Sequence, residues 1–195
     1  RRRQCHREPR RMNAGTIFGV GLGPGDADLM TVRADRLLRN ARHVAFFRKP
    51  GRQGQARRIV NGMLAERVTE FAMEYPVTTE ISLSDPAYNQ ILSTFYDSCC
   101  THLGSLCDGG SDVIVLCEGD PFFYGSFMHL HRRLLPKYEV QVVPAITGMS
   151  GAWTATNMPI TWGDDVLTVL MGTLPEDEIQ RKIADTDAAI IMKVG

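Results

Sequence analysis

The feature that most constrains the fold of this chain is an alternation between short apolar runs and longer segments of helical periodicity. Between the runs, apolar residues recur at helical spacing, most clearly over 28–40 and 85–106. Strands that alternate with helices form mainly parallel sheets covered by helices, so we predict an α/β fold. The runs are rich in β-branched and aromatic residues and lie at 16–22, 42–47, 67–72, 112–117, 139–143, 166–171 and 188–194.

The chain of 195 residues is long enough for two domains that each bury a core. A break at residues 135–137 ends one helical segment and precedes a strand, and we place the domain boundary there. We predict a tail over 1–14, an N-terminal α/β domain over 15–136 and the start of a C-terminal α/β domain over 137–195. Because no helix follows the last strand to cover it, we expect the second domain to lack its C-terminal end.

Charge and hydropathy exclude several classes of partner. Residues 1–11 hold six Arg and one Glu, a net charge of +5, so the rest of this neutral chain carries −5. A basic tail could be a nucleic-acid arm or a transit-peptide remnant. Because Met12 directly follows the Arg-rich residues, we interpret this tail as lying outside the fold. An acidic body argues against nucleic acid as a partner. No apolar run approaches the roughly 18 residues that span a bilayer, so we expect a soluble protein without a membrane partner.

The cysteines suggest neither a metal site nor a disulfide framework. The chain has five of them, no pair has CxxC spacing, and no His pair completes a zinc site. An odd number without an apolar signal segment fits a reducing compartment, and we expect a cytoplasmic location. We predict no metal and interpret the cysteines as structural.

The first strand runs into a glycine-rich turn, residues 19–26, with the sequence GVGLGPGD. Only glycine lets a ligand approach the backbone so closely, which favours a nucleotide-like cofactor. The dinucleotide fingerprint GxGxxG nevertheless fails, because Pro24 or Asp26 stands at its last position, depending on the frame. A tight strand-to-helix turn is the alternative, and both interpretations stay open.

The fourth strand leads into Glu118 and the sequence EGDPFFYG, which combines two carboxylates with three aromatic rings. Carboxylates can hold ribose hydroxyls or stabilise a cation, and the rings offer stacking surface. The alternative is a helix start, with Asp120 as the cap and Pro121 at the first position. Because ligands of parallel sheets bind beyond the carboxyl ends of the strands, loops of this kind at successive strand ends predict a binding site.

Together these motifs resemble the tetrapyrrole methylases. The resemblance covers residues 15–195 and rests on GVGLGPGD, EGDPFFYGSF, VVPAITGMS and VLTVLMGTLPE. Within the family, EGDPFFYGSFMHLH and AAIIMKVG are most similar to the members that methylate C(20) of precorrin-2, or of cobalt-precorrin-2, in corrin (vitamin B12) biosynthesis. The resemblance implies a homodimer of two α/β domains, with S-adenosylmethionine and a tetrapyrrole substrate in the cleft between the domains.

Carried onto this chain, the resemblance also assigns site residues. Apart from the resemblance, their place on strand-end loops makes Glu118, Asp120 and Asp26 candidate general bases, and Tyr124 could donate a hydrogen bond to a substrate carboxylate or ring nitrogen. The implied cofactor contacts are Pro24, Glu118, Gly119, Asp120, Phe123, Thr147, Gly148 and Met171.

A basic segment follows the second strand. Residues 48–58 carry five basic side chains and no acidic one, and Arg48, Lys49 and Arg52 could clamp the carboxylates of the substrate. The alternative is a solvated surface loop. Other functions also stay open: methylation of uroporphyrinogen III or a later precorrin, an NADP-dependent oxidoreductase with Arg48 on the 2′-phosphate, and a non-catalytic ligand-binding remnant.

Overall fold

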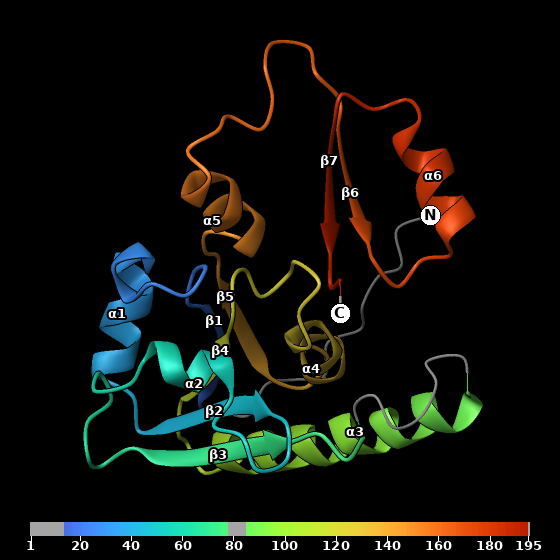
Figure 1. Ribbon diagram of the computed structural model, residues 1–195. Helices are drawn as coiled ribbons and strands as arrows, with labels where there is room; N and C mark the ends of the chain where they lie inside the picture. Colours follow the sequence, from blue (N-terminus) through green and yellow to red (C-terminus); the bar gives the residue numbers. More distant parts are fainter. Residues whose placement is uncertain (1–13, 78–84, 195) are drawn as a thin grey trace. The chain divides into compact units, whose positions relative to one another are not determined.

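A computed structural model describes residues 14–77 and 85–194, and it is an α/β protein built on parallel sheets (Figure 1). The main sheet has the strand order β3-β2-β4-β1-β5, and all of its neighbouring strands are parallel. The predicted fold class is confirmed. Its strands are β1 (Thr16–Gly21), β2 (His43–Arg48), β3 (Thr69–Glu74), β4 (Val113–Cys117) and β5 (Glu139–Val143).

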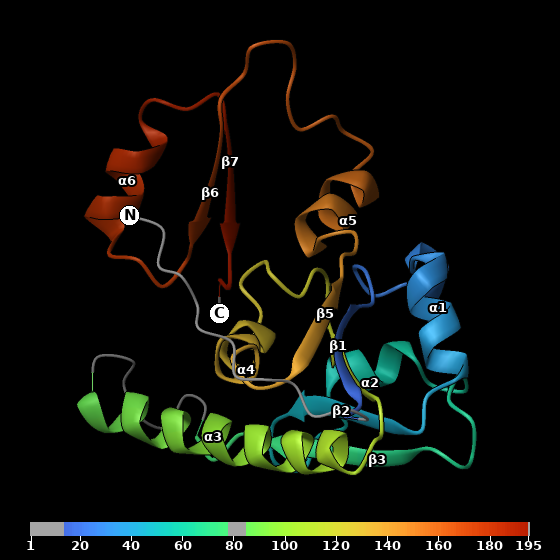
Figure 2. The ribbon, with the colours of Figure 1, turned by 180° about the vertical axis from the view of Figure 1, so that it is seen from behind.

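Helices cover both faces of this sheet, as the two opposite views show (Figures 1 and 2). On one face, α3 (Pro86–Asp108) and α4 (Phe127–Leu134) pack against Val113 and Val115 of β4. On the other face, α1 (Val32–Arg39) and α2 (Gln55–Ile59) pack against Ile114 and Leu116. Side chains alternate between the faces of a strand, so a strand covered on both sides is apolar throughout. All five residues of β4 are accordingly buried.

Local capping signals explain where the helices begin. The Asp85 carboxylate accepts a hydrogen bond from the backbone N–H of Ala87, and Pro86 occupies the first turn of α3. The Thr31 hydroxyl accepts from the N–H of Ala34 and starts α1, after a short 3₁₀ turn, η1 (Ala27–Leu29). The predicted helical segments 28–40 and 85–106 therefore contain real helices.

The described part of the chain divides into two compact units, the first ending at Gly148 and the second beginning at Met149. The boundary predicted at 136 would assign β5 to the second domain. In the structure, β5 pairs with β1 along its whole length, from Thr16 opposite Glu139 to Val20 opposite Val143. Backbone hydrogen bonds thus make β5 an edge strand of the first sheet, and the division falls after it. The predicted tail lies outside the described residues, apart from Ala14.

The second unit has a small parallel sheet of its own. Strands β6 (Leu167–Met171) and β7 (Ala188–Met192) pair in register and are connected by α6 (Glu176–Ile183). Another helix, α5 (Gly148–Ala155), precedes them and begins at the last residue of the first unit. Among the helices of the described residues, none is both long enough and apolar enough to cross a membrane.

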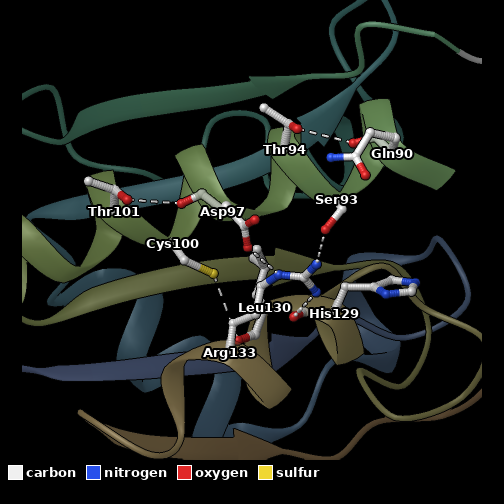
Figure 3. A network of polar contacts seen from close by, with 9 residues as sticks. All are labelled: Gln90, Ser93, Thr94, Asp97, Cys100, Thr101, His129, Leu130 and Arg133. Carbon is white, nitrogen blue, oxygen red and sulfur yellow. Dashed lines mark hydrogen bonds and ion pairs between the residues drawn. The ribbon is translucent and has the colours of Figure 1, made fainter. Parts of the chain in front are cut away.

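Arg133 of α4 makes several of the polar contacts that connect α3 and α4 (Figure 3). The Arg133 guanidinium of α4 donates to Asp97 at 2.7 Å and to Ser93 at 3.0 Å, both on α3, and to the backbone carbonyl of His129 at 3.1 Å. Its planar group also lies 5.5 Å from the ring centre of Tyr96. These contacts act together with the burial of Phe127, Leu130 and Leu134 to hold α4, whose N-terminal end borders the loop that follows β4.

Candidate functional site

The two motifs predicted to form a site lie next to each other at the carboxyl edge of the main sheet. Strands β1 and β4 are neighbours in parallel register, with Gly21 opposite Cys117. The pairing continues into the loops: the N–H of Leu22 donates to the carbonyl of Cys117 at 3.0 Å, and the N–H of Gly119 donates to the carbonyl of Gly23 at 2.9 Å. The GPGD turn and the EGDP loop therefore form one continuous surface.

Glycine is required where these loops meet. A Cβ added at Gly21 would lie 2.6 Å from Ala145 Cβ and 2.7 Å from the carbonyl oxygen of Gly119. Gly23 and Gly119 have φ of 81° and 57°, which L-residues rarely adopt. By contrast, a Cβ at Gly25 would meet no atom within 4 Å. The first glycines thus serve close packing of the loops, and open space lies beside the backbone of the last one.

Asp120 joins the β4 loop to the β5 loop. One carboxylate oxygen accepts from the N–H of Phe122 at 2.9 Å, and the other accepts from the N–H of Ala145 at 3.0 Å. The alternative of a helix beginning at Pro121 is wrong, since α4 begins at Phe127 and Asp120 closes a turn instead. Both carboxylate oxygens are therefore engaged in holding backbone.

Glu118 faces a different neighbourhood. Its carboxylate accepts a backbone hydrogen bond from Ala56 at the start of α2 and lies within electrostatic reach of Arg58. The residue keeps an exposed surface, but desolvation by the surrounding chain outweighs these two favourable contacts and raises the pKa of Glu118 above its ordinary value. The third predicted carboxylate, Asp26, accepts from the N–H of Asp28 at 3.0 Å and caps η1.

The predicted aromatic residues form an exposed border of the loop after β4. Phe122 is 49% exposed and Tyr124 is 39% exposed. The Phe123 and Tyr124 rings meet edge to face with centres 5.0 Å apart, and Phe122 meets His131 in the same way at 4.8 Å. Tyr124 also has a φ of 52°, an uncommon conformation for a residue with a side chain. Fixed rings that remain open to solvent provide a stacking surface.

The loop after β5 reaches the same edge. Thr147 and Gly148 follow this strand, and a Cβ at Gly119 would lie 3.4 Å from the backbone nitrogen of Gly148. A Cβ at Gly148 itself would meet nothing within 4 Å. Three strand ends, those of β1, β4 and β5, thus bring most of the predicted cofactor contacts together.

The predicted substrate residues lie at the end of β2, the strand beside β4, and in the turn that follows it. Arg48 is the last residue of β2 and forms an ion pair with Glu74, the last residue of β3, at 3.0 Å. Lys49 and Arg52 form the turn that follows, in which the N–H of Arg52 donates to the carbonyl of Lys49 at 3.1 Å. The positive charge of Arg48 is therefore partly neutralised by Glu74, a residue that the sequence pattern did not mark.

Met171 belongs to the second unit, where it ends β6. The next residue, Gly172, donates its N–H to the carbonyl of Met192 at 2.6 Å. A Cβ at Gly172 would lie 3.1 Å from the carbonyl oxygen of Lys193, whose φ is 55°. The ends of β6 and β7 are therefore closely packed within this unit. The part of Met171 in cofactor binding stays a prediction.

Sequence reasoning missed two tyrosines beside this edge. Tyr75 follows β3, and its hydroxyl shares a hydrogen bond with that of Ser126 at the end of the loop after β4. Tyr96 of α3 is hydrogen-bonded to both hydroxyls. Ser126 stood within the quoted EGDPFFYGSF motif and was a usable signal, whereas no sequence pattern marked the tyrosines.

The described residues contain no group of three or more His, Cys, Asp and Glu side chains that could hold a metal ion. The four cysteines within the described ranges, at positions 99, 100, 107 and 117, are free. Burial raises the pKa of Cys99 and Cys107 to about 12, and that of Cys100 to about 11, so these thiols remain protonated at neutral pH. Their interpretation as structural residues is consistent with these environments.

A parallel α/β sheet whose strand ends carry glycine-rich, acidic and aromatic loops is typical of an enzyme that binds a nucleotide-like cofactor. The sequence profile of the Tetrapyrrole (Corrin/Porphyrin) Methylases matches residues 16–195. The chain belongs to this family, which confirms the resemblance seen in its motifs.

Known relatives agree with that assignment. A precorrin-2 C(20)-methyltransferase from Sinorhizobium sp is 47% identical over 94% of this chain and 75% of its own length. The cobalamin biosynthesis protein CobIJ of Mycobacterium tuberculosis (strain ATCC 25618 / H37Rv) is 42% identical over 93% of this chain, which spans 36% of that longer protein. A crystal structure of uroporphyrin-III C-methyl transferase from Thermus thermophilus, complexed with S-adenyl homocysteine, has a TM-score of 0.55 at 22% identity. That likeness covers 83% of this chain and 57% of the other and shows a shared fold.

Proposed function

We propose that this protein is an S-adenosylmethionine-dependent methyltransferase that methylates C(20) of precorrin-2, or of its cobalt complex, in corrin biosynthesis. The observation that carries the proposal is the 47% identity to a precorrin-2 C(20)-methyltransferase over 94% of this chain. The arrangement at the strand ends supports it, because three loops there gather glycine backbone, carboxylates and exposed rings.

The residues present fit such a cofactor. Open space beside Gly25 and Gly148 allows an adenosyl group to approach the backbone, and the exposed ring border supplies stacking surface. S-adenosylmethionine, when bound, supplies an electrophilic methyl group on a positively charged sulfur. For its contacts we propose Pro24, Glu118, Gly119, Asp120, Phe123, Thr147, Gly148 and Met171.

In this reaction the protein mainly holds a carbon nucleophile in line with the sulfur–methyl bond. Orientation of this kind can supply roughly 7–11 kcal/mol of barrier reduction. C(20) of the tetrapyrrole forms the new bond to the methyl group, the methyl–sulfur electron pair remains on the sulfur as S-adenosylhomocysteine forms, and a proton must then leave the substrate. We propose that Glu118 accepts this proton, and that Tyr124 forms a hydrogen bond to a carboxylate or ring nitrogen of the substrate.

The contacts of the three candidate bases support the choice of Glu118. Both oxygens of Asp120 accept backbone hydrogen bonds, and Asp26 caps η1. The raised pKa of Glu118 makes its carboxylate a stronger base than an ordinary one. For the substrate carboxylates we propose Arg48, Lys49 and Arg52, since β2 lies beside β4 in the sheet.

The decisive experiment incubates the purified protein anaerobically with precorrin-2 and S-adenosylmethionine that carries a ¹³C-labelled methyl group. We expect one equivalent of S-adenosylhomocysteine for each methyl group gained, with the label located at C(20) by NMR. Label at another carbon would assign the protein to a different tetrapyrrole methylation. Cofactor binding without any methyl transfer would favour a non-catalytic binding protein. We further propose that the protein is a homodimer. Size-exclusion chromatography coupled to light scattering would test this by measuring its molar mass in solution.

A further inference from the structure

Three hydroxyl groups meet at the side of the site that faces α3. Tyr75 follows β3, Tyr96 lies in α3 and Ser126 immediately precedes α4. The hydroxyls of Tyr75 and Ser126 share a hydrogen bond, and the Tyr96 hydroxyl is hydrogen-bonded to both. Tyr96 is 5% exposed and Tyr75 is half-buried. Because this hydroxyl cluster is largely withdrawn from water, its hydrogen bonds are directional constraints between three elements.

Aromatic rings hold Tyr75 in place. Phe47, next to the end of β2, stacks on it with ring centres 5.4 Å apart and an angle of 17° between the planes. Phe95 of α3 contacts both tyrosines, with centre distances of 5.3 Å to each. The Tyr96 ring stacks in turn on His129 of α4 at 4.5 Å. A ring packed from two sides keeps its hydroxyl at a defined point.

Tyr75 contacts both of the segments that we assign to ligand binding. Its backbone N–H donates to the carbonyl of Arg48 at 3.0 Å, at the start of the basic segment. Its side-chain hydroxyl reaches Ser126, the last residue of the loop 118–126. At the other end of that loop, Asp120 holds the backbone of Ala145. The exposed aromatic residues lie between these two anchors.

We propose that Tyr75 is a positioning residue, which sets the loop 118–126 relative to the Arg48 end of β2. This inference rests on the proposed function, in which the loop binds the cofactor and Arg48 binds the substrate. Tyr75 acts through Ser126 and through the backbone, without contact to the reacting atoms. Its hydroxyl keeps the methyl donor and the acceptor carbon in line, so that losing the hydroxyl lowers the turnover rate more than it weakens cofactor binding.

The test compares Tyr75→Phe with Tyr138→Phe. The control removes a hydroxyl that donates to Asp108 at 3.3 Å, and Tyr138 lies just before the amino-terminal end of β5, at the edge of the sheet opposite the loop. For Tyr75→Phe we expect kcat to fall roughly 3- to 10-fold, the effect of one hydrogen bond, while the Kd for S-adenosylhomocysteine changes less than 2-fold, about the spread of such measurements. Tyr138→Phe should leave both quantities unchanged.

A second measurement does not depend on activity. Hydrogen exchange of the backbone amides in 118–126 should be faster in Tyr75→Phe and in Ser126→Ala than in wild type, and unchanged in Tyr138→Phe. Because both substitutions remove the contact between Tyr75 and Ser126, their effects on exchange in the double variant should add to less than the sum of the single effects. Wild-type exchange and kinetics in Tyr75→Phe would overturn the inference. If the wild-type protein neither binds S-adenosylhomocysteine nor turns over, the proposed function fails, and the exchange data still decide whether Tyr75 positions the loop.

Discussion

At the residue scale, we propose Glu118 as the general base, and this proposal predicts how activity depends on pH. We expect Glu118→Gln to lower kcat by roughly 100-fold at neutral pH, the low end of the contribution of a general base. In the wild type, kcat should fall as the pH drops through the raised pKa of Glu118. Pre-steady-state and steady-state rates measured across the acidic range would check both statements.

Glutamine can still accept the hydrogen bond from Ala56, so this variant separates charge from shape. Because the folded state raises the pKa of Glu118, its contribution to stability falls as pH rises from the ordinary value through the raised one. The variant should therefore be at least as stable as wild type at neutral pH, so that a loss of rate is not a loss of folding. An unchanged kcat combined with weaker S-adenosylhomocysteine binding would make Glu118 a cofactor contact instead.

At the scale of elements, Arg133 supplies hydrogen bonds that contribute to the packing of α4 on α3. Lysine keeps the charge at this position but lacks the planar fork that reaches Asp97, Ser93 and the His129 carbonyl together. We expect Arg133→Lys to lower the free energy of unfolding by about 1–2 kcal/mol, mainly through the lost hydrogen bonds, since Asp97 is 64% exposed and an exposed ion pair contributes little. Urea denaturation followed by circular dichroism measures this change.

The neighbouring residue supplies a matched control. Arg132 has the same side chain on the same helix but is exposed. Arg132→Lys should change the free energy of unfolding by less than about 0.5 kcal/mol, as surface substitutions usually do. Equal effects of the two substitutions would mean that the contacts of Arg133 do not stabilise the pairing of α3 and α4.

At the scale of the whole molecule, cofactor choice separates the proposed function from an NADP-dependent oxidoreductase. A ligand that binds only the folded protein stabilises it by about 2.7 kcal/mol when present at 100 times its Kd. We expect S-adenosylhomocysteine to raise the unfolding temperature in a concentration-dependent manner and NADP to leave it unchanged. Scanning calorimetry with each ligand measures the shift. A shift with NADP alone would contradict the proposed cofactor.

Much of the fold was predictable from local pattern. The apolar runs matched the strands because a strand buried on both faces, such as β4, must be apolar along its length. The glycine-rich turn and the EGDP loop were predictable as neighbours because parallel strands end at the same edge of a sheet. The domain boundary was not, because the partner of β5 is β1, more than a hundred residues away in the chain, and hydrogen-bond pairing decided where β5 belongs.

The sequence by itself determined the α/β class, the family and the segments that form the candidate site, since these depend on residue types at fixed spacing. Only the tertiary structure decided which chemical group each side chain meets. It engaged both oxygens of Asp120 with backbone, paired Arg48 with Glu74 and brought Tyr75 to Ser126. The physical reason is that these contacts, apart from the local one between Asp120 and the N–H of Phe122, join segments distant in the chain. A hydrogen bond or a pKa shift depends on which atoms the packed core brings within a few ångströms.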